Sequence, residues 1–184
     1  MLKNFKKSLI VSDVVKRGSY HYFVNPLTSG VPEINPEVIK EICESIISLV
    51  ETKNVDIILT IESMGIHISS VLSQMTGIPF NIVRKKSQQI PDEMILKQVT
   101  GYGTSNLYMT LPKNKKVLIV DSVISTGGTL IAVIDGLKKL NTDIIDIVCV
   151  VERGEGVKKV KEKTGYDVKT LVRICIKGDK VVLL

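Results

Sequence analysis

Four short runs of almost uninterrupted apolar residues constrain the fold of this chain more than any other feature. The runs are rich in β-branched residues and cover positions 55–61, 79–83, 117–120 and 144–151. Strands that are apolar on both faces are typical of a parallel sheet with helices on each side. Amphipathic helical patterns alternate with the runs, at positions 36–50, 63–76 and 128–140. The alternation predicts an α/β domain with a mostly parallel, doubly wound sheet flanked by helices.

A long polar connection interrupts this alternation. It covers 84–111, between the second and third apolar runs, and contains two possible short strands at 94–96 and 107–109. A connection of this length inside a compact domain is usually functional. We therefore expect a hairpin-like excursion that carries a mobile loop around Gly101 and Gly103.

The N-terminal segment shows no secretory pattern, and the C-terminal segment has a hairpin pattern. The N-terminal segment contains Lys3, Lys6 and Lys7 but no apolar stretch long enough for a signal peptide. No apolar run approaches the ~20 residues that a membrane-spanning helix needs. At the C-terminus, two apolar stretches within 168–184 flank a Gly-Asp turn and predict a terminal hairpin. We expect a cytoplasmic protein without membrane contact.

Composition and charge narrow the function classes. A chain of 184 residues fits one domain, and a hydrophobic content of 44% excludes a disordered chain. The net charge of +6 could favour binding to nucleic acid, to a membrane surface or to a phosphorylated small molecule. No RNA-binding motif supports nucleic acid, so a small polyanionic substrate stays open. The cysteines, Cys43, Cys149 and Cys175, lack metal-binding or disulfide spacing and are expected to be buried free thiols in a reducing compartment.

The most informative stretch is 117–129, the third apolar run with the residues that follow it. The predicted strand ends at Asp121, and a short loop leads to a helix that opens with Thr-Gly-Gly-Thr at 126–129. Ligands bind at the carboxyl ends of the strands in open α/β sheets. Glycines admit a ligand close to the backbone, and the free N–H groups and dipole of a helix start attract an anion. An acid can bind sugar hydroxyls, and the helix start beside it can bind a phosphate, so the pair predicts a sugar phosphate as the ligand. The spacing fits neither a Walker loop nor a dinucleotide-binding turn.

This stretch resembles the 5-phosphoribosyl-1-pyrophosphate (PRPP) binding motif of type I phosphoribosyltransferases, in which four apolar residues, two acids and a variable stretch precede Thr-Gly-Gly-Thr. Further segments resemble the archaeal hypoxanthine/guanine phosphoribosyltransferases, which are similar to adenine phosphoribosyltransferases. These segments are 16–26, 60–67, 83–86, 100–102 and 150–156. The resemblance implies a single domain of the type I phosphoribosyltransferase fold over 1–184, with a small hood in 1–35 and a flexible loop region in 84–111.

The resemblance also implies which residues bind PRPP. They are Glu62, Ser63, Met64, Gly65, Lys86, Asp121, Ser122, Ser125, Thr126, Gly127, Gly128 and Thr129. The catalytic residues that it implies are Asp121, Arg84 and Lys85, because cations at a strand end can neutralise pyrophosphate and arginine binds it bidentately. From the residues alone, an ordinary capped helix start is the favoured interpretation of 62–65, and at least one of the three cations is expected to belong to a solvated charge run.

Base recognition is implied at the hood and at two strand ends. Tyr22 and Phe23 either stack on the purine or anchor the N-terminal segment to the core. Val123 and Glu152 complete the expected base contacts. Glu152 and its neighbour Arg153 either line the base pocket or form an exposed pair at a loop.

The implied reaction displaces pyrophosphate from C1 of PRPP by a purine nitrogen, so that hypoxanthine or guanine becomes IMP or GMP in purine salvage. Mg²⁺ would bind through PRPP or pyrophosphate with few protein ligands, and no metal site made by the protein alone is expected. The expected partners are PRPP and a purine base, with a homodimer implied by the resemblance and no nucleic acid. The alternatives are a non-catalytic sensor of PRPP or a nucleotide with the same fold, an adenine-specific transferase, and a basic nucleic-acid-binding protein.

One residue and one segment depart from the family pattern. Ser122 stands where the family has its second acid, and it brings a hydroxyl without a charge. Residues 87–92, Ser-Gln-Gln-Ile-Pro-Asp, stand where archaeal relatives tend to have a basic residue and Leu-Pro-Gly. Both departures affect PRPP binding and loop closure, and they are the reason for keeping the sensor alternative.

Overall fold

A six-stranded sheet forms the centre of the computed structural model, which describes residues 2–18, 20–100 and 103–184. The strand order is β10-β9-β8-β7-β3-β4. These strands are β3 (Ile57–Ile61), β4 (Phe80–Val83), β7 (Lys116–Ile124), β8 (Asp143–Arg153), β9 (Lys169–Lys177) and β10 (Lys180–Leu183). Neighbours pair in parallel except β10, which runs antiparallel to β9 at one edge. The predicted α/β class and the predicted terminal hairpin are confirmed.

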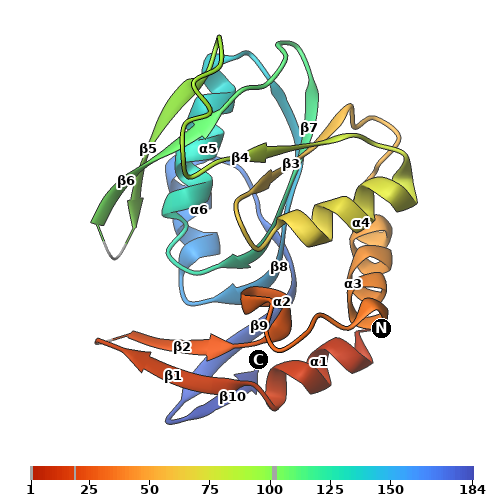
Figure 1. Cartoon of the computed structure of the whole chain (residues 1–184), viewed down its shortest axis with the longest axis vertical. Coiled ribbons are helices and arrows are strands. Elements are labelled where there is room, and N and C mark those ends of the chain that lie inside the picture. The colour runs from red at the N-terminus through yellow and green to blue at the C-terminus, as the bar shows by residue number, and fades with distance from the viewer. Residues whose placement is uncertain (1, 19, 101–102) are drawn as a thin grey trace.

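Helices cover both faces of the sheet (Figure 1). They are α1 (Lys3–Ile10), α2 (Pro26–Ser29), α3 (Pro36–Leu49), α4 (Ile66–Thr76), α5 (Gly128–Lys139) and α6 (Gly156–Thr164). On β7, Leu118 and Val120 belong to the core under α3 and α4, whereas Val117 and Ile119 belong to the core under α5. Successive side chains of a strand point to opposite faces, so a sheet between two helical layers requires apolar residues at every position. Of the helices in the described part of the chain, none is long and apolar enough to cross a membrane.

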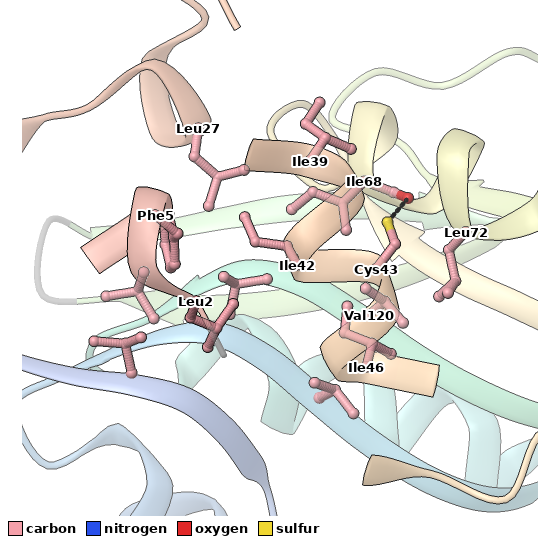
Figure 2. Close-up of a cluster of buried hydrophobic side chains, with 14 of the residues drawn as sticks. Leu2, Phe5, Leu27, Ile39, Ile42, Cys43, Ile46, Ile68, Leu72 and Val120 are labelled. Carbon is pink, nitrogen blue, oxygen red and sulfur yellow. Dashed lines mark hydrogen bonds between the residues drawn. The ribbon is translucent and has the colours of Figure 1, made fainter. Parts of the chain in front are cut away.

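The first of the two cores lies between the sheet and helices α1, α3 and α4 (Figure 2). Phe5, Ile42 and Ile46 are fully buried there, and each such side chain contributes about 1.5–3 kcal/mol by leaving water. Cys43 Sγ lies 3.6 Å from the backbone oxygen of Ile68 and joins α3 to α4. Cys43 and Cys149 are buried free thiols as predicted, whereas Cys175 is only partly buried because it lies on the edge hairpin.

Several elements differ from the sequence prediction. Helix α4 begins at Ile66 rather than at position 63, because 62–65 form a turn before it. Strand β7 continues past position 120 to Ile124, since it keeps pairing with β8 as far as the Ile124–Glu152 pair. These elements had no counterpart in the prediction: α1, α2, α6 and the first hairpin, which consists of β1 (Asp13–Arg17) and β2 (Tyr20–Val24).

The predicted excursion is a second antiparallel hairpin, formed by β5 (Met94–Thr100) and β6 (Gly103–Met109). It lies against α5 and covers part of the second core (Figure 1). A Cβ at Gly136 of α5 would lie 2.4 Å from Leu96 Cδ2, so the helix leaves space there for the strand. The expected mobile loop stays a prediction, because Gly101 lies outside the described residues, as do Tyr102 and Ser19 of the segments that carry the family resemblance.

Candidate active site

A cavity of about 420 Å³ opens at the carboxyl ends of β3 and β7. Its wall combines the turn after β3, the end of β7 with the following loop, the N-terminal hairpin and the β5–β6 hairpin. The wall includes these residues that the sequence analysis assigned to the site: Tyr22, Phe23, Glu62, Ser63, Met64, Lys85, Asp121, Ser122, Val123, Ser125, Thr126, Gly127 and Thr129. Segments more than a hundred residues apart in sequence therefore meet at one site.

Asp121 is the acid at the end of the apolar part of β7. Its Oδ1 accepts a 2.7 Å hydrogen bond from the backbone N–H of Ser122. Burial raises the pKa of Asp121 to about 7, while the Ser122 N–H and the positive charge of Lys85 act to lower it. A carboxyl with this pKa exchanges its proton near neutral pH, and it can accept a hydrogen bond from a ligand hydroxyl when ionised.

The loop after β7 brings backbone and hydroxyl groups to the cavity. Gly127 has a φ of 77°, and a Cβ there would lie 2.8 Å from the backbone oxygen of Gly156, so the loop packs directly on the start of α6. Helix α5 begins at the next residue, Gly128, which places its free N–H groups and positive dipole end at the loop. Thr126 and Thr129 line the cavity beside it. This arrangement can bind a phosphate group.

The turn after β3 is held by the neighbouring strand β4. The backbone N–H of Glu62 donates to the oxygen of Val83 at 2.9 Å, and Glu62 Oε2 accepts from the backbone N–H of Lys85 at 2.9 Å. Gly65 ends the turn, and a Cβ there would lie 2.1 Å from Thr60 Oγ1 and 3.2 Å from Asp121 Oδ1. Thr60 Oγ1 is buried and has no hydrogen-bond partner among the described residues. The turn therefore sits tightly against the base of the cavity.

Five predicted site residues do not line this cavity: Gly65, Arg84, Lys86, Gly128 and Glu152. Gly65 is the residue before α4, and Gly128 is the first residue of α5. Arg84 is bonded through its backbone to Tyr108 in both directions at 2.8 Å, and the residue lines a separate cavity of about 330 Å³. Lys86 is exposed.

Glu152 points away from the cavity toward β9. Its carboxylate accepts from Thr170 Oγ1 at 3.2 Å and lies 3.4 Å from Arg173 Nε. The next residue, Arg153, lines the cavity instead, because successive side chains of β8 alternate between the two faces. Of the two neighbours that the sequence analysis left open for the base pocket, the arginine is the one in the cavity wall.

Other lining residues had no signal in the sequence: Thr28, Ile61, Gln98, Leu107, Ile124 and Leu130. Gln98 is a polar residue of the β5–β6 hairpin that reaches the 126–129 loop at the start of α5. Its Nε2 donates to Thr129 Oγ1 at 2.5 Å. Its position depends on how the hairpin docks on α5, which no local pattern reveals. Across 2–18, 20–100 and 103–184, no group of three or more His, Cys, Asp or Glu residues could hold a metal ion.

Comparison with known proteins identifies relatives over the whole chain. Residues 33–178 match the model of the phosphoribosyl transferase domain family. The chain is 46% identical over 185 residues to the hypoxanthine/guanine phosphoribosyltransferase of Methanothermus fervidus, covering 100% of this chain and 98% of the relative. It is 50% identical over 171 residues to the enzyme of that name from Methanotorris igneus, covering 92% and 93%.

Solved structures with the same fold include adenine phosphoribosyltransferases. The one from Thermoanaerobacter pseudethanolicus has a TM-score of 0.76 at 22% identity and covers 94% of this chain and 99% of its own. The one from Trypanosoma brucei, solved in complex with AMP, pyrophosphate and ribose-5-phosphate, has a TM-score of 0.75 at 18% identity, covering 94% and 79%. At these identities the likeness concerns the fold.

Proposed function

The chain belongs to the phosphoribosyl transferase domain family, and from this premise we propose that it transfers the 5-phosphoribosyl group of PRPP to hypoxanthine or guanine. The products are pyrophosphate and IMP or GMP. The relatives from Methanothermus fervidus and Methanotorris igneus, which span nearly the whole chain, carry this activity in their names. The protein is thus proposed as an enzyme of purine salvage.

One observation carries the proposal: an acid and a loop that can bind a phosphate line the same cavity. Asp121 lines it together with Ser125, Thr126, Gly127 and Thr129, where the loop leads into the start of α5. Ribose hydroxyls and a 5′-phosphate need these two kinds of group a few ångströms apart. The turn 62–65 lies on the neighbouring strand β3, where backbone N–H groups are available for pyrophosphate.

The chemistry requires positioning and charge stabilisation rather than a protein nucleophile. The bond from C1 to the pyrophosphate oxygen breaks, pyrophosphate leaves with the electron pair, and a purine nitrogen supplies the pair for the new bond. Lys85 lines the cavity and would stabilise the negative charge of the leaving group, while ionised Asp121 would orient the ribose. Leu107 and Gln98 of the β5–β6 hairpin form one side of the cavity wall.

The proposed base is a 6-oxopurine. Tyr22, Phe23 and Val123 supply aromatic and apolar surface, and Arg153 lines the same cavity. An arginine side chain carries donors and no acceptor, so it suits the O6 acceptor of hypoxanthine or guanine better than the amino group of adenine. This chemistry favours hypoxanthine and guanine over the adenine-specific alternative.

Mg²⁺ is the proposed cofactor, and the residues present fit its preferences. Asp121 and Glu62 are carboxylates in the cavity wall, and Mg²⁺ usually takes most of its ligands from substrate phosphates and water. When bound with PRPP, the ion would neutralise charge on the pyrophosphate. A cytoplasmic homodimer is proposed with it, and light scattering on the purified protein tests the dimer.

Nucleotide formation from PRPP and Mg²⁺ with hypoxanthine, guanine, adenine and xanthine, each in turn, tests the function. We expect turnover with hypoxanthine and guanine. Binding of PRPP without turnover of any of the four bases would replace the enzyme by a sensor of the same fold. Turnover restricted to adenine would overturn the proposed base.

A further inference from the structure

The β5–β6 hairpin has two faces of different character. On one face, Leu96 and its cross-strand partner Leu107 are buried against α5. On the other face, Ile95 is 61% exposed, and Lys97 with its partner Asn106 is also exposed. This period of two shows that the hairpin lies flat on the helix with a defined register.

Gln98 continues the inner face beyond the apolar contact. Leu96 packs at Gly136, and Gln98, two residues further along β5, reaches Thr129. Thr129 and Gly136 are seven residues apart, and residues at this spacing lie on one side of a helix. Strand β5 therefore runs along α5 from Gly136 to the first turn of the helix, beside the 126–129 loop.

The hydrogen bond between Gln98 and Thr129 determines what the hydroxyl can do. Gln98 Nε2 donates to Thr129 Oγ1 at 2.5 Å, and Gln98 Oε1 lies 3.4 Å from Ser105 Oγ, which can donate to it. A hydroxyl has one proton and two lone pairs. Once Oγ1 accepts from the amide, its proton is directed to another acceptor, and the cavity that Thr129 lines is where a ligand would supply one.

We propose that Gln98 is a positioning residue for the 5′-phosphate: it holds the Thr129 hydroxyl as a donor to the phosphate and so couples the β5–β6 hairpin to the phosphate loop. The inference rests on the proposed function, since it takes the 126–129 loop as the phosphate site. Nucleotide binding then depends on how the β5–β6 hairpin packs on α5. The side chain that links the two, Gln98, belongs neither to the 126–129 loop nor to the acid that would bind the ribose.

The test replaces Gln98 by side chains of similar size. Gln98→Met keeps the length but removes the donor, and Gln98→Glu turns the donor into an acceptor that draws the Thr129 proton away from the ligand. Calorimetry with IMP should show weaker binding by about 3- to 10-fold for Gln98→Met and by more for Gln98→Glu. The KM for hypoxanthine should stay unchanged, which separates a phosphate effect from a general loss of structure.

A double-mutant cycle with Thr129→Val completes the test, because Gln98→Met should have no further effect once the hydroxyl is gone. Asn106→Ala is the matched control, since it removes an exposed amide on the outer face of the same hairpin and should leave IMP binding unchanged. IMP binding within twofold of wild type in Gln98→Met, or an equal loss in the Thr129→Val background, would overturn the inference. A wild-type protein that binds neither IMP nor PRPP would instead overturn the proposed function, and the inference with it.

Discussion

Two strand–loop–helix units lie side by side in the sheet, and each directs a loop into the same cavity. Strands β3 and β7 pair in parallel, and a glycine precedes the helix in each unit, Gly65 before α4 and Gly127 before α5. Their backbones differ, because Gly65 has a φ of −85° and Gly127 a φ of 77°. The first glycine could be any residue as far as the backbone is concerned, whereas the second requires the left-handed region.

The neighbours of the two glycines differ as well. A Cβ at Gly65 would meet the side chain of Thr60 first, at 2.1 Å, and the backbone oxygen of Ile61 only at 3.3 Å, whereas a Cβ at Gly127 would meet the backbone oxygen of Gly156 first, at 2.8 Å. Close packing on a side chain can be relieved by changing that side chain, but close packing on backbone cannot. One architecture thus makes a loop that depends on side chains and a loop that depends on the main chain.

The acids of the two units have different tasks. Glu62 in the first loop accepts from the backbone N–H of Lys85 and so holds β3 and β4 together. Asp121 in the second unit precedes its loop and has a pKa raised to about 7 by burial. The first acid stabilises the turn, and the second is available to a ligand at the cost of being poorly solvated.

The largest effect should follow from Gly127→Ala. The new Cβ would lie 2.8 Å from Gly156 O and 3.0 Å from Val160 Cγ2, at a φ that alanine disfavours. We expect a loss of about 2–4 kcal/mol in the free energy of unfolding, measured by urea denaturation, and no detectable IMP binding. The matched control is Gly165→Ala, which has a φ of 83° but no neighbour within 4 Å in the described structure. If both variants lose the same stability, the loop is not held by α6.

Gly65→Ala should cost less and should be reversible. Its Cβ would lie 2.1 Å from Thr60 Oγ1, and we expect a loss of about 1–3 kcal/mol in the free energy of unfolding. Thr60→Ala in the same chain should recover at least half of the loss, because it removes the clashing and otherwise unpartnered hydroxyl. Urea denaturation of the two single variants and the double variant measures the recovery. No recovery would mean that the first loop also depends on main-chain packing.

The parts of the fold that the sequence predicted are those with a dense local signal. The apolar runs identified β3, β4, β7 and β8 because both faces of each strand are covered. Helix α6 gave no such signal, since it consists mostly of lysine and glutamate and buries only Gly156 and Val160. The first hairpin was missed for the same reason: Val15 on β1 is 42% exposed, so its pattern is not that of a buried strand.

The site was predictable where its residues are contiguous. Asp121 and the loop 125–129 follow each other in the chain, so one motif identified them together. At two strand ends the prediction did not separate the lining residue from its neighbours: Arg84, Lys85 and Lys86 were all expected after β4, where Lys85 lines the cavity, and Glu152 was expected to contact the base with Arg153 left open, where Arg153 lines the cavity. Spacing along the chain does not fix which neighbour faces a cavity, because that depends on the register and twist of the sheet.

Asp121→Asn tests the acid of the second unit through its pH dependence. A folded pKa of about 7 against the ordinary aspartate pKa of 3.8 means that the folded protein binds this proton more strongly than the unfolded chain does. Asp121 therefore makes wild-type stability fall as the pH rises from about 4 to 7, and Asp121→Asn should remove this decline. Urea denaturation at several pH values measures it.

The same variant should lose ligand affinity on the alkaline side. Ionised Asp121 would accept a hydrogen bond from a ribose hydroxyl, which is worth about 1.5–3 kcal/mol, or roughly 10- to 150-fold in affinity. The ratio of IMP affinity between wild type and Asp121→Asn should therefore grow as the pH passes 7, as calorimetry at pH 6 and pH 8 can measure. Because both proteins bind the same nucleotide, ionisation of its phosphate cancels in the ratio. A constant ratio would mean that Asp121 does not contact the ribose as a carboxylate.

Ser122→Asp should have the smallest effect. It tests which of the two units supplies a second negative charge to the ligand. Ser122 is 6% exposed and lines the cavity beside Asp121. A second carboxylate could add a charged hydrogen bond to ribose, but burial beside Asp121 opposes its ionisation and cancels part of the gain. We expect PRPP with Mg²⁺ to bind up to about tenfold more tightly at pH 8 and with little change at pH 6, measured by calorimetry against Ser122→Asn, which has the same shape without the charge. If the gain is absent while Glu62→Gln weakens PRPP binding, the first loop already supplies the second charge, and Glu62 serves the ligand as well as the turn.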